Sequence, residues 1–111
     1  MKHHRSERVA SLIKEELGKI LIEELEMPPG VLLTITEVFV TNKLENAKIM
    51  VSIYPSSESG KFFEILKKKQ GELQFILSRK MNIRPMPRIE FEIDLGPERA
   101  ARVEKRLMEN Q

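Results

Sequence analysis

The spacing between two short alternating segments is the feature that most constrains how this chain can fold. AKIMVSIY (residues 47–54) and RIEFEID (residues 88–94) each place apolar side chains at every second position, which is typical of strands with one buried face. More than thirty residues separate the two segments, far more than a hairpin needs. A connection of this length favours parallel pairing through a right-handed crossover, which places the connecting helical residues on one face of the sheet.

The residues before the first of these segments, residues 5–41, predict a helix and another strand. Apolar side chains recur three or four positions apart over residues 5–26, which predicts a long amphipathic helix that ends before Pro28-Pro29-Gly30. LLTITEVFVT (residues 32–41) is rich in β-branched side chains and predicts a strand. Because a short polar turn joins it to residues 47–54, we expect an antiparallel hairpin. The apolar positions of the predicted helix are Val9, Leu12, Ile13, Leu17, Ile20, Leu21 and Leu25.

The crossover has a helical pattern that is interrupted by one glycine. Because glycine is a poor helix former, we expect Gly71 to split the region into two helices with a kink between them. Pro85 and Pro87 then end the helical run. Gly96-Pro97 opens a final short helix over residues 97–109. The apolar positions of these helices are Phe62, Phe63, Ile65 and Leu66 before the glycine, Leu73, Ile76, Leu77 and Met81 after it, and Val103 and Leu107 near the C-terminus.

Together these elements predict an α+β fold with a single domain over residues 1–111, whose core spans about residues 5–95. A hydrophobic content of 41% in 111 residues suits one modest core. The expected order is helix, strand, strand, helix, kink, helix, strand and short C-terminal helix, around a three-stranded mixed sheet. This order resembles the type II KH fold, which is often used on RNA, although a fold alone does not assign function.

What the sequence lacks disfavours several classes of function. The chain has no cysteine, and no apolar run approaches the roughly 20 residues that span a bilayer. The polar start MKHHRSER lacks the apolar core of a signal peptide, so we expect a cytoplasmic protein. We also expect the protein to be a monomer. His3 and His4 have no third ligand nearby, so no metal is expected. No nucleophile lies beside a plausible base, so we expect no enzyme activity, cofactor or small-molecule substrate.

Positive charge is concentrated in the middle of the chain. The net charge is only +2, but residues 61–88 hold 8 basic and 2 acidic side chains. Residues 1–60 hold 7 basic and 9 acidic side chains, and residues 89–111 hold 4 and 6. Such segregation favours one face that meets negative charge, and a solvated helix surface is the alternative.

The stretch KKKQG provides the first candidate binding residues. Successive residues on a helix point about 100° apart, so at most two of Lys67, Lys68 and Lys69 should contact RNA phosphates together. Lys69 follows Leu66 by three positions, so its stem can lie along apolar surface. In the alternative interpretation, Gly71 is only a helix C-cap and the lysines are solvated. The further candidates for phosphate binding are Arg79, Lys80, Arg84, Arg88, Arg5 and Arg8.

Three blocks of the sequence are similar to the ribosome-binding factor A family. They are RSERVASLIKEELGKIL, LTITEVFVTNKLENAKIMVS and QGELQFILSRKMNIRPMPRIEFEID, in that order, and the resemblance covers residues 5 to about 107. The positions that carry it are Arg8, Val9, Ile13, Glu16 and Leu21 in the first block, Thr36, Val38, Leu44, Ala47, Lys48 and Ile49 in the second, and Gly71, Leu77, Met81, Arg84, Pro87, Phe91 and Asp94 in the third.

The resemblance implies a function that composition and periodicity do not. Members of this family are non-enzymatic assembly factors of the bacterial small ribosomal subunit. The resemblance therefore implies binding to the small subunit and its rRNA late in assembly, assistance with maturation of the rRNA 5′ end, and importance in the cold. The alternative from another class is a basic interaction module that docks an acidic protein.

The glycine pattern predicts how RNA would be bound. A KH domain grips single strands with a Gly-x-x-Gly loop, whose backbone can approach phosphates closely. Gly71 has no partner three positions away, and Lys69 occupies the alanine position of the family's usual Ala-x-Gly break. We therefore expect recognition of shape and phosphates rather than bases. Phe62, Phe63, Phe75 and Phe91 are expected in the core, which leaves Tyr54 as the free aromatic side chain.

Overall fold

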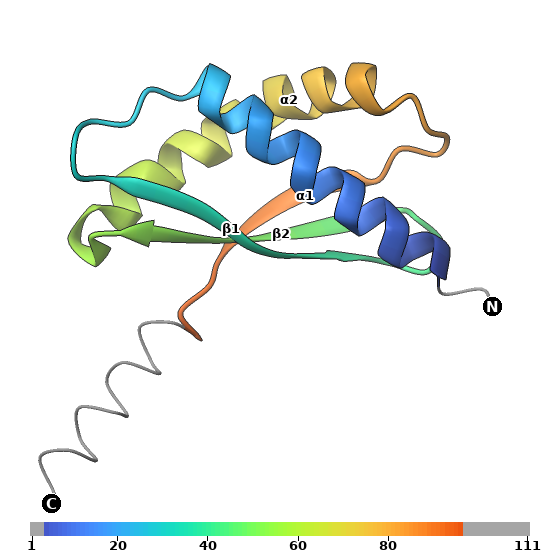
Figure 1. Cartoon of the computed structure of the whole chain (residues 1–111), viewed down its shortest axis with the longest axis horizontal. Coiled ribbons are helices and arrows are strands. Elements are labelled where there is room, and N and C mark those ends of the chain that lie inside the picture. The colour runs from blue at the N-terminus through green and yellow to red at the C-terminus, as the bar shows by residue number, and fades with distance from the viewer. Residues whose placement is uncertain (1–3, 97–111) are drawn as a thin grey trace, which may run out of the picture.

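The computed structural model describes residues 4–96, which form two helices, a three-stranded sheet and one short 3₁₀ turn (Figure 1). The predicted C-terminal helix over residues 97–109 lies outside the described residues. The predicted first helix and all three strands are present, close to their predicted bounds. The elements are α1 (His4–Glu24), β1 (Leu32–Val40), β2 (Asn46–Tyr54), η1 (Ser56–Glu58), α2 (Ser59–Met81) and β3 (Arg88–Ile93).

The sheet has the strand order β1-β2-β3 and mixed pairing. Strands β1 and β2 pair antiparallel, with Leu32 opposite Tyr54 and Val40 opposite Ala47. Strands β2 and β3 pair parallel, with Ile49 opposite Phe91. The register of β1 shifts between Ile35 and Glu37, so Thr36 forms a bulge in this edge strand. Both predicted pairings, and the α+β class with a mixed sheet, are confirmed.

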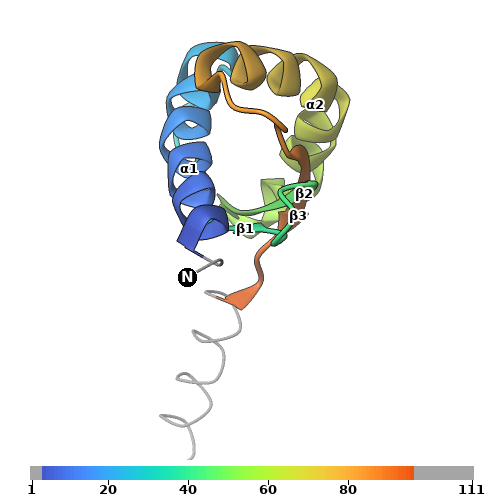
Figure 2. The same cartoon turned by 90° about the vertical axis from the view of Figure 1, so that its right-hand side faces the viewer.

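Both helices cover the same face of the sheet, as the long crossover predicted (Figure 2). The alternating positions Ala47, Ile49, Val51 and Ile53 of β2 are buried beneath the helices. Ala47, Ile49 and Val51 pack in one apolar cluster with side chains from α1, α2 and β3. The largest fully buried members of this cluster are Ile13, Leu17, Ile20, Ile49, Leu66, Leu73, Leu77 and Ile89.

The predicted separation of the crossover into two helices at Gly71 is wrong. Helix α2 runs without a break through Gly71, and the positive φ recorded for a glycine among the described residues is at Gly30. The helix instead ends at Met81 and is capped by Asn82, which has a left-handed conformation and donates its backbone N–H to the Ser78 carbonyl. Gly71 is therefore not a C-cap either.

The buried residues of α2 explain why the helix continues. Phe62, Leu66, Leu73 and Leu77 are all buried, and their spacing keeps one helical phase on both sides of the glycine. Burial of this continuous stripe outweighs the poor helix propensity of one glycine, which costs about 1 kcal/mol. The axis of α2 nevertheless curves over the sheet, so the change of direction occurs within a continuous helix (Figure 1). The element order agrees with that of a type II KH domain in which one curved helix replaces two.

Candidate nucleic-acid interface

The outer face of α2 carries a stripe of exposed side chains. Lys61, Lys68 and Phe75 follow one another at two-turn intervals, and Arg79 lies one turn beyond Phe75. All four are exposed, as is Glu72, the acid on the same stripe. We call these five residues the α2 outer stripe. They point away from the sheet because the buried residues of α2 occupy the opposite side of the helix.

Phe75 does not lie in the core, so that prediction is wrong. Its side chain is 62% exposed, and the guanidinium carbon of Arg79 lies 5.6 Å from the centre of its ring. Its position between Leu73 and Leu77, which both face the core, is the sequence signal that could have placed it on the surface. Phe62 and Phe91 are buried as predicted, Phe63 is half-buried, and Tyr54 is exposed as predicted.

The three consecutive lysines have three different surroundings. Lys67 forms an ion pair with Glu64, 3.8 Å away, and its ammonium lies 5.8 Å from the centre of the Phe63 ring. Lys69 is half-buried, and its Nζ donates a hydrogen bond of 3.4 Å to the carbonyl of Glu24, the last residue of α1. Lys68 is exposed and has no ion pair within residues 4–96.

These surroundings rank the lysines as candidates for binding an anion. The carbonyls at the end of a helix lack intrahelical partners and carry partial negative charge, so a lysine ammonium stabilises them. Lys69 therefore has a structural role in joining α1 to α2. Lys68 is the strongest candidate of the three for an external phosphate.

The structure brings a second set of predicted cations together at the other end of the helices. Arg5, in the first turns of α1, donates from Nη2 to the carbonyl of Arg84, 3.5 Å away, in the link between α2 and β3. Arg79 and Lys80 lie in the last turn of α2, immediately before that link. Within the described part of the chain, no ion pair involves any of the seven exposed cations Arg5, Arg8, Lys68, Arg79, Lys80, Arg84 and Arg88.

Two glutamines of α2 close the outer edge of β3, a feature that sequence reasoning missed. Gln74 accepts a hydrogen bond of 2.7 Å from the Ile89 backbone N–H and donates one of 3.0 Å to the Pro87 carbonyl. Gln70 donates to the Ile89 carbonyl at 2.9 Å. Because Ile89 already has both backbone groups paired, this edge offers no free backbone partner there to another strand or to a base.

The edge strand β1 is protected differently. Its bulged residue Thr36 has its carbonyl bound by Lys14 of α1 at 3.3 Å, and its hydroxyl donates to the Asp94 carboxylate at 2.6 Å. The hydrogen bond from Thr36 is the main cause that lowers the pKa of Asp94 below its usual value, and a hydrogen bond from the Gly96 backbone N–H adds to this effect.

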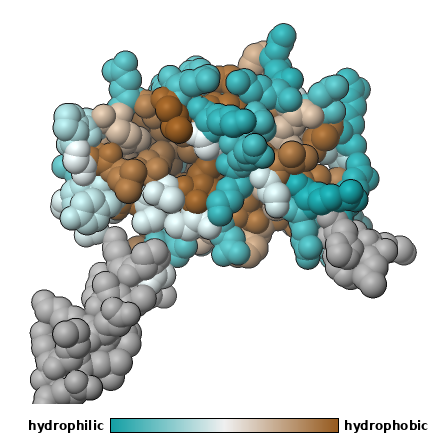
Figure 3. Space-filling view, in the orientation of Figure 1, coloured by the Kyte–Doolittle hydropathy of each residue, from teal (hydrophilic) through white to brown (hydrophobic). Residues whose placement is uncertain are grey.

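Beside β1, a hollow of about 580 Å³ opens toward the C-terminal half of α1. Figure 3 shows hydrophobic side chains gathered on this face between patches of hydrophilic residues.

Two further kinds of site are absent from the described residues. No group of three or more His, Cys, Asp or Glu side chains within residues 4–96 could hold a metal ion. In the same range, neither helix has the length and apolar content needed to cross a membrane. The described residues form a two-layer α+β domain whose outer helix face carries cations without ion pairs in that range, and the element order is consistent with KH-like topology.

Comparison with known proteins places the chain within a family. Residues 5–107 match the family model of ribosome-binding factor A, and the chain belongs to that family. It is 41% identical over 109 residues to the ribosome-binding factor A of Chlorobium phaeobacteroides, with 95% of this chain and 92% of that protein covered.

Solved structures agree with this assignment. The NMR structure of a putative ribosome binding factor A of Thermotoga maritima shares the fold, with a TM-score of 0.69, 21% identity and coverage of 85% of this chain and 91% of that one. A homology model of the Thermus thermophilus protein, fitted into a cryo-EM map of a 30S–RbfA complex, has a TM-score of 0.64 and 25% identity. That match covers 77% of this chain and 90% of the other.

Proposed function

We propose that this protein binds the small ribosomal subunit through its rRNA and assists a late step of subunit assembly in the cytoplasm, including maturation of the rRNA 5′ end. Family membership and the Thermus thermophilus relative fitted into a 30S complex support the partner. The observation that carries the proposal is the set of exposed cations without ion pairs within residues 4–96, on α2 and at its junction with α1. Exposed cations of this kind replace the counterions of RNA phosphates.

The proposed mode of binding is recognition of phosphates and shape. The chain has no Gly-x-x-Gly sequence, so it lacks the loop with which a KH domain holds a single strand. The glutamines that bind Ile89 also occupy backbone groups at the edge of β3. Both features favour contact with folded rRNA over the reading of a short single-stranded sequence. In this proposal the protein acts by binding alone, with no catalytic step and no cofactor.

Co-sedimentation through a sucrose gradient tests the proposal. We expect the protein to travel with free small subunits and to be depleted from mature ribosomes. Short single-stranded oligonucleotides of varied sequence should bind weakly and with little preference. Strong selection of one four-base sequence, or no association with small subunits, would overturn the proposal. Binding to an acidic protein without subunits would support the alternative of a basic docking module.

The role in rRNA maturation requires a test in cells. Depletion of the protein should cause small subunits to accumulate with an unprocessed rRNA 5′ end, and the effect should be greater in the cold. Primer extension on subunit rRNA measures the 5′ end directly. Fully processed rRNA in depleted cells at low temperature would remove maturation from the proposed function while leaving subunit binding intact.

A further inference from the structure

Phe75 is an exposed aromatic side chain within a charged surface. Large apolar side chains on a helix normally face the core, yet 62% of Phe75 is exposed on the α2 outer stripe. Lys68 lies two turns before it and Arg79 one turn after it. The ring therefore contributes little to the fold and is available to a ligand that also meets positive charge.

The contact with Arg79 prepares this ring for a planar partner. The Arg79 guanidinium carbon lies 5.6 Å from the ring centre, which is within the range of a cation–π interaction. Because the two residues are four apart on a helix, the pair is held by local geometry. A guanidinium and an aromatic ring are both flat, and both stack on nucleic-acid bases.

Two other cation–ring pairs in α2 show why Phe75 differs. Lys61 lies 5.5 Å from the ring centre of Phe62, and Lys67 lies 5.8 Å from that of Phe63. Phe62 is buried and Phe63 is half-buried, so both rings are committed to the interior. Of the three pairs, only the one formed by Phe75 presents an exposed ring.

The other exposed phenylalanine lies in a different electrostatic setting. Phe39 of β1 is 53% exposed and lines a hollow whose other walls include Glu90 and Glu92. Lys48 in the same hollow is paired with Glu92 at 3.3 Å. Two carboxylates beside one neutralised lysine repel RNA, whereas the surroundings of Phe75 include one acid, Glu72, between Lys68 and Arg79.

We propose that Phe75, together with Arg79, stacks against an unpaired base of RNA. The inference rests on the proposed function and adds a base contact to its phosphate contacts. Stacking suits a site that does not select sequence, because every base has a flat face. Lys68 would neutralise a phosphate beside the stacked nucleotide.

Substitution of Phe75 by leucine tests the stacking interaction. Phe75→Leu keeps an apolar side chain but removes the aromatic ring, so affinity for small subunits should fall about 5-fold or more, as expected for the loss of one stacked base. The slope of log affinity against log salt should stay the same, because no charge is lost. Thermal unfolding should also be unchanged, since the side chain is exposed. Equal binding by Phe75→Leu and the unchanged protein would overturn the stack, while failure of both to bind would instead contradict the proposed function.

Fluorescence provides a direct readout of the contact. The chain has no tryptophan, so Phe75→Trp introduces a single tryptophan, whose emission can be followed selectively and whose ring can still stack. Its emission should be quenched by protein-free small-subunit rRNA and by intact small subunits, and affinity should be retained. Phe39→Trp is the matched control on the far face of the sheet and should not respond. Quenching by intact subunits but not by protein-free rRNA would place the ring against a ribosomal protein and overturn the proposal.

Discussion

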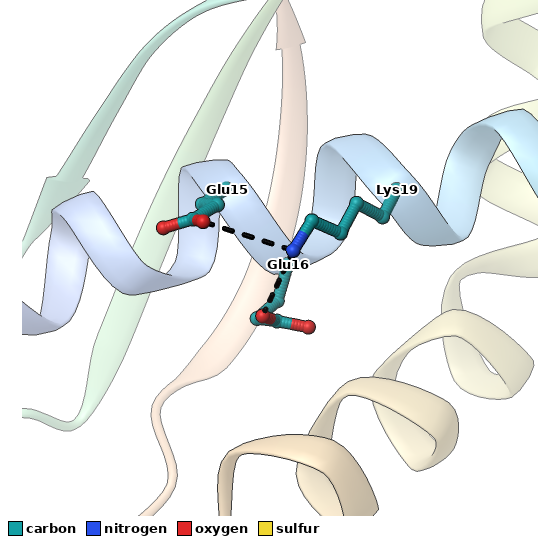
Figure 4. A network of polar contacts seen from close by, with 3 residues as sticks. All are labelled: Glu15, Glu16 and Lys19. Carbon is teal, nitrogen blue, oxygen red and sulfur yellow. Dashed lines mark ion pairs between the residues drawn. The ribbon is translucent and has the colours of Figure 1, made fainter.

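Helices α1 and α2 cover the same face of the sheet, but their outer faces carry charge in different ways. On α1, the Lys19 ammonium lies 3.7 Å from carboxylate oxygens of both Glu15 and Glu16 (Figure 4). On α2, Lys68 and Arg79 have no ion pair with a described residue. Charge around Lys19 of α1 is thus partly neutralised, whereas the α2 outer stripe leaves Lys68 and Arg79 exposed to a partner. Lys67 of α2, which pairs with Glu64, lies outside that stripe.

The inner faces of the two helices are alike. Ile13 and Leu17 of α1 and Leu66 and Leu73 of α2 are all fully buried. Each helix also protects one edge of the sheet, α1 through Lys14 and α2 through two glutamines. The difference between the outer faces therefore is not required by the shared core. The proposed binding role would explain why α2 keeps this exposed charge.

The largest expected effects test whether the inner faces are equivalent. Leu17→Ala and Leu73→Ala should each lower the free energy of unfolding by about 2 to 5 kcal/mol, because each leaves a cavity in the core. Denaturant titration followed by circular dichroism measures both. Leu12→Ala, at a half-exposed position of α1, is the control and should cost less. A loss of unfolding free energy near zero for either leucine variant would show that its helix does not contribute to the common core.

Loss of the contacts that protect the sheet edges should have a smaller effect on the free energy of unfolding, and the effect should be greater for α2 than for α1. Gln74→Leu keeps similar bulk but leaves the Ile89 N–H and Pro87 carbonyl unpaired, which should cost about 1 to 3 kcal/mol. Lys14→Met removes one exposed bond of 3.3 Å and should cost less than about 1 kcal/mol. Equal losses for the two variants, measured by thermal unfolding, would show that the glutamine contacts are no stronger than the lysine contact.

One glycine in each helix offers a third comparison. Gly18 in α1 and Gly71 in α2 both lie inside continuous helix, and a Cβ atom at either position would meet nothing within 4 Å. Replacement by alanine should stabilise the protein by about 0.5 to 1 kcal/mol in each case. Gly30→Ala is the control and should destabilise, because Gly30 has a φ of +88°. A less stable Gly71→Ala variant, with a normal Gly18→Ala variant, would restore a conformational break in α2.

The comparison of the helices also shows what sequence could and could not predict. Periodicity placed α1, the three strands and their pairing, because each of these depends on a regular apolar pattern. The low helix propensity of glycine predicts a break at Gly71. The helix continues instead, because Leu66 and Leu73 on either side of Gly71 lie on the same buried face. The same helical periodicity predicts Phe75 on the exposed side of α2, where the structure places it.

Other features of the interface depend on tertiary position. Gln74 is an ordinary polar residue in the sequence, and its role appears only when β3 returns beside α2. Lys69 likewise looks like its two neighbours until the end of α1 lies within reach of its ammonium. The positive charge of residues 61–88 was visible in the sequence, but the identity of its unpaired members required the fold.

The salt dependence of binding to small subunits tests the central claim most directly. Lys68→Ala combined with Arg79→Ala should make the slope of log affinity against log salt shallower by about 1.4 to 1.8, from about 0.7 to 0.9 per lost phosphate contact. The control, Lys14→Ala combined with Lys19→Ala, removes the same charge from α1 and should leave the slope unchanged. An unaltered slope in the α2 variant, or an equal change in the α1 variant, would contradict the claim that the outer face of α2 meets rRNA.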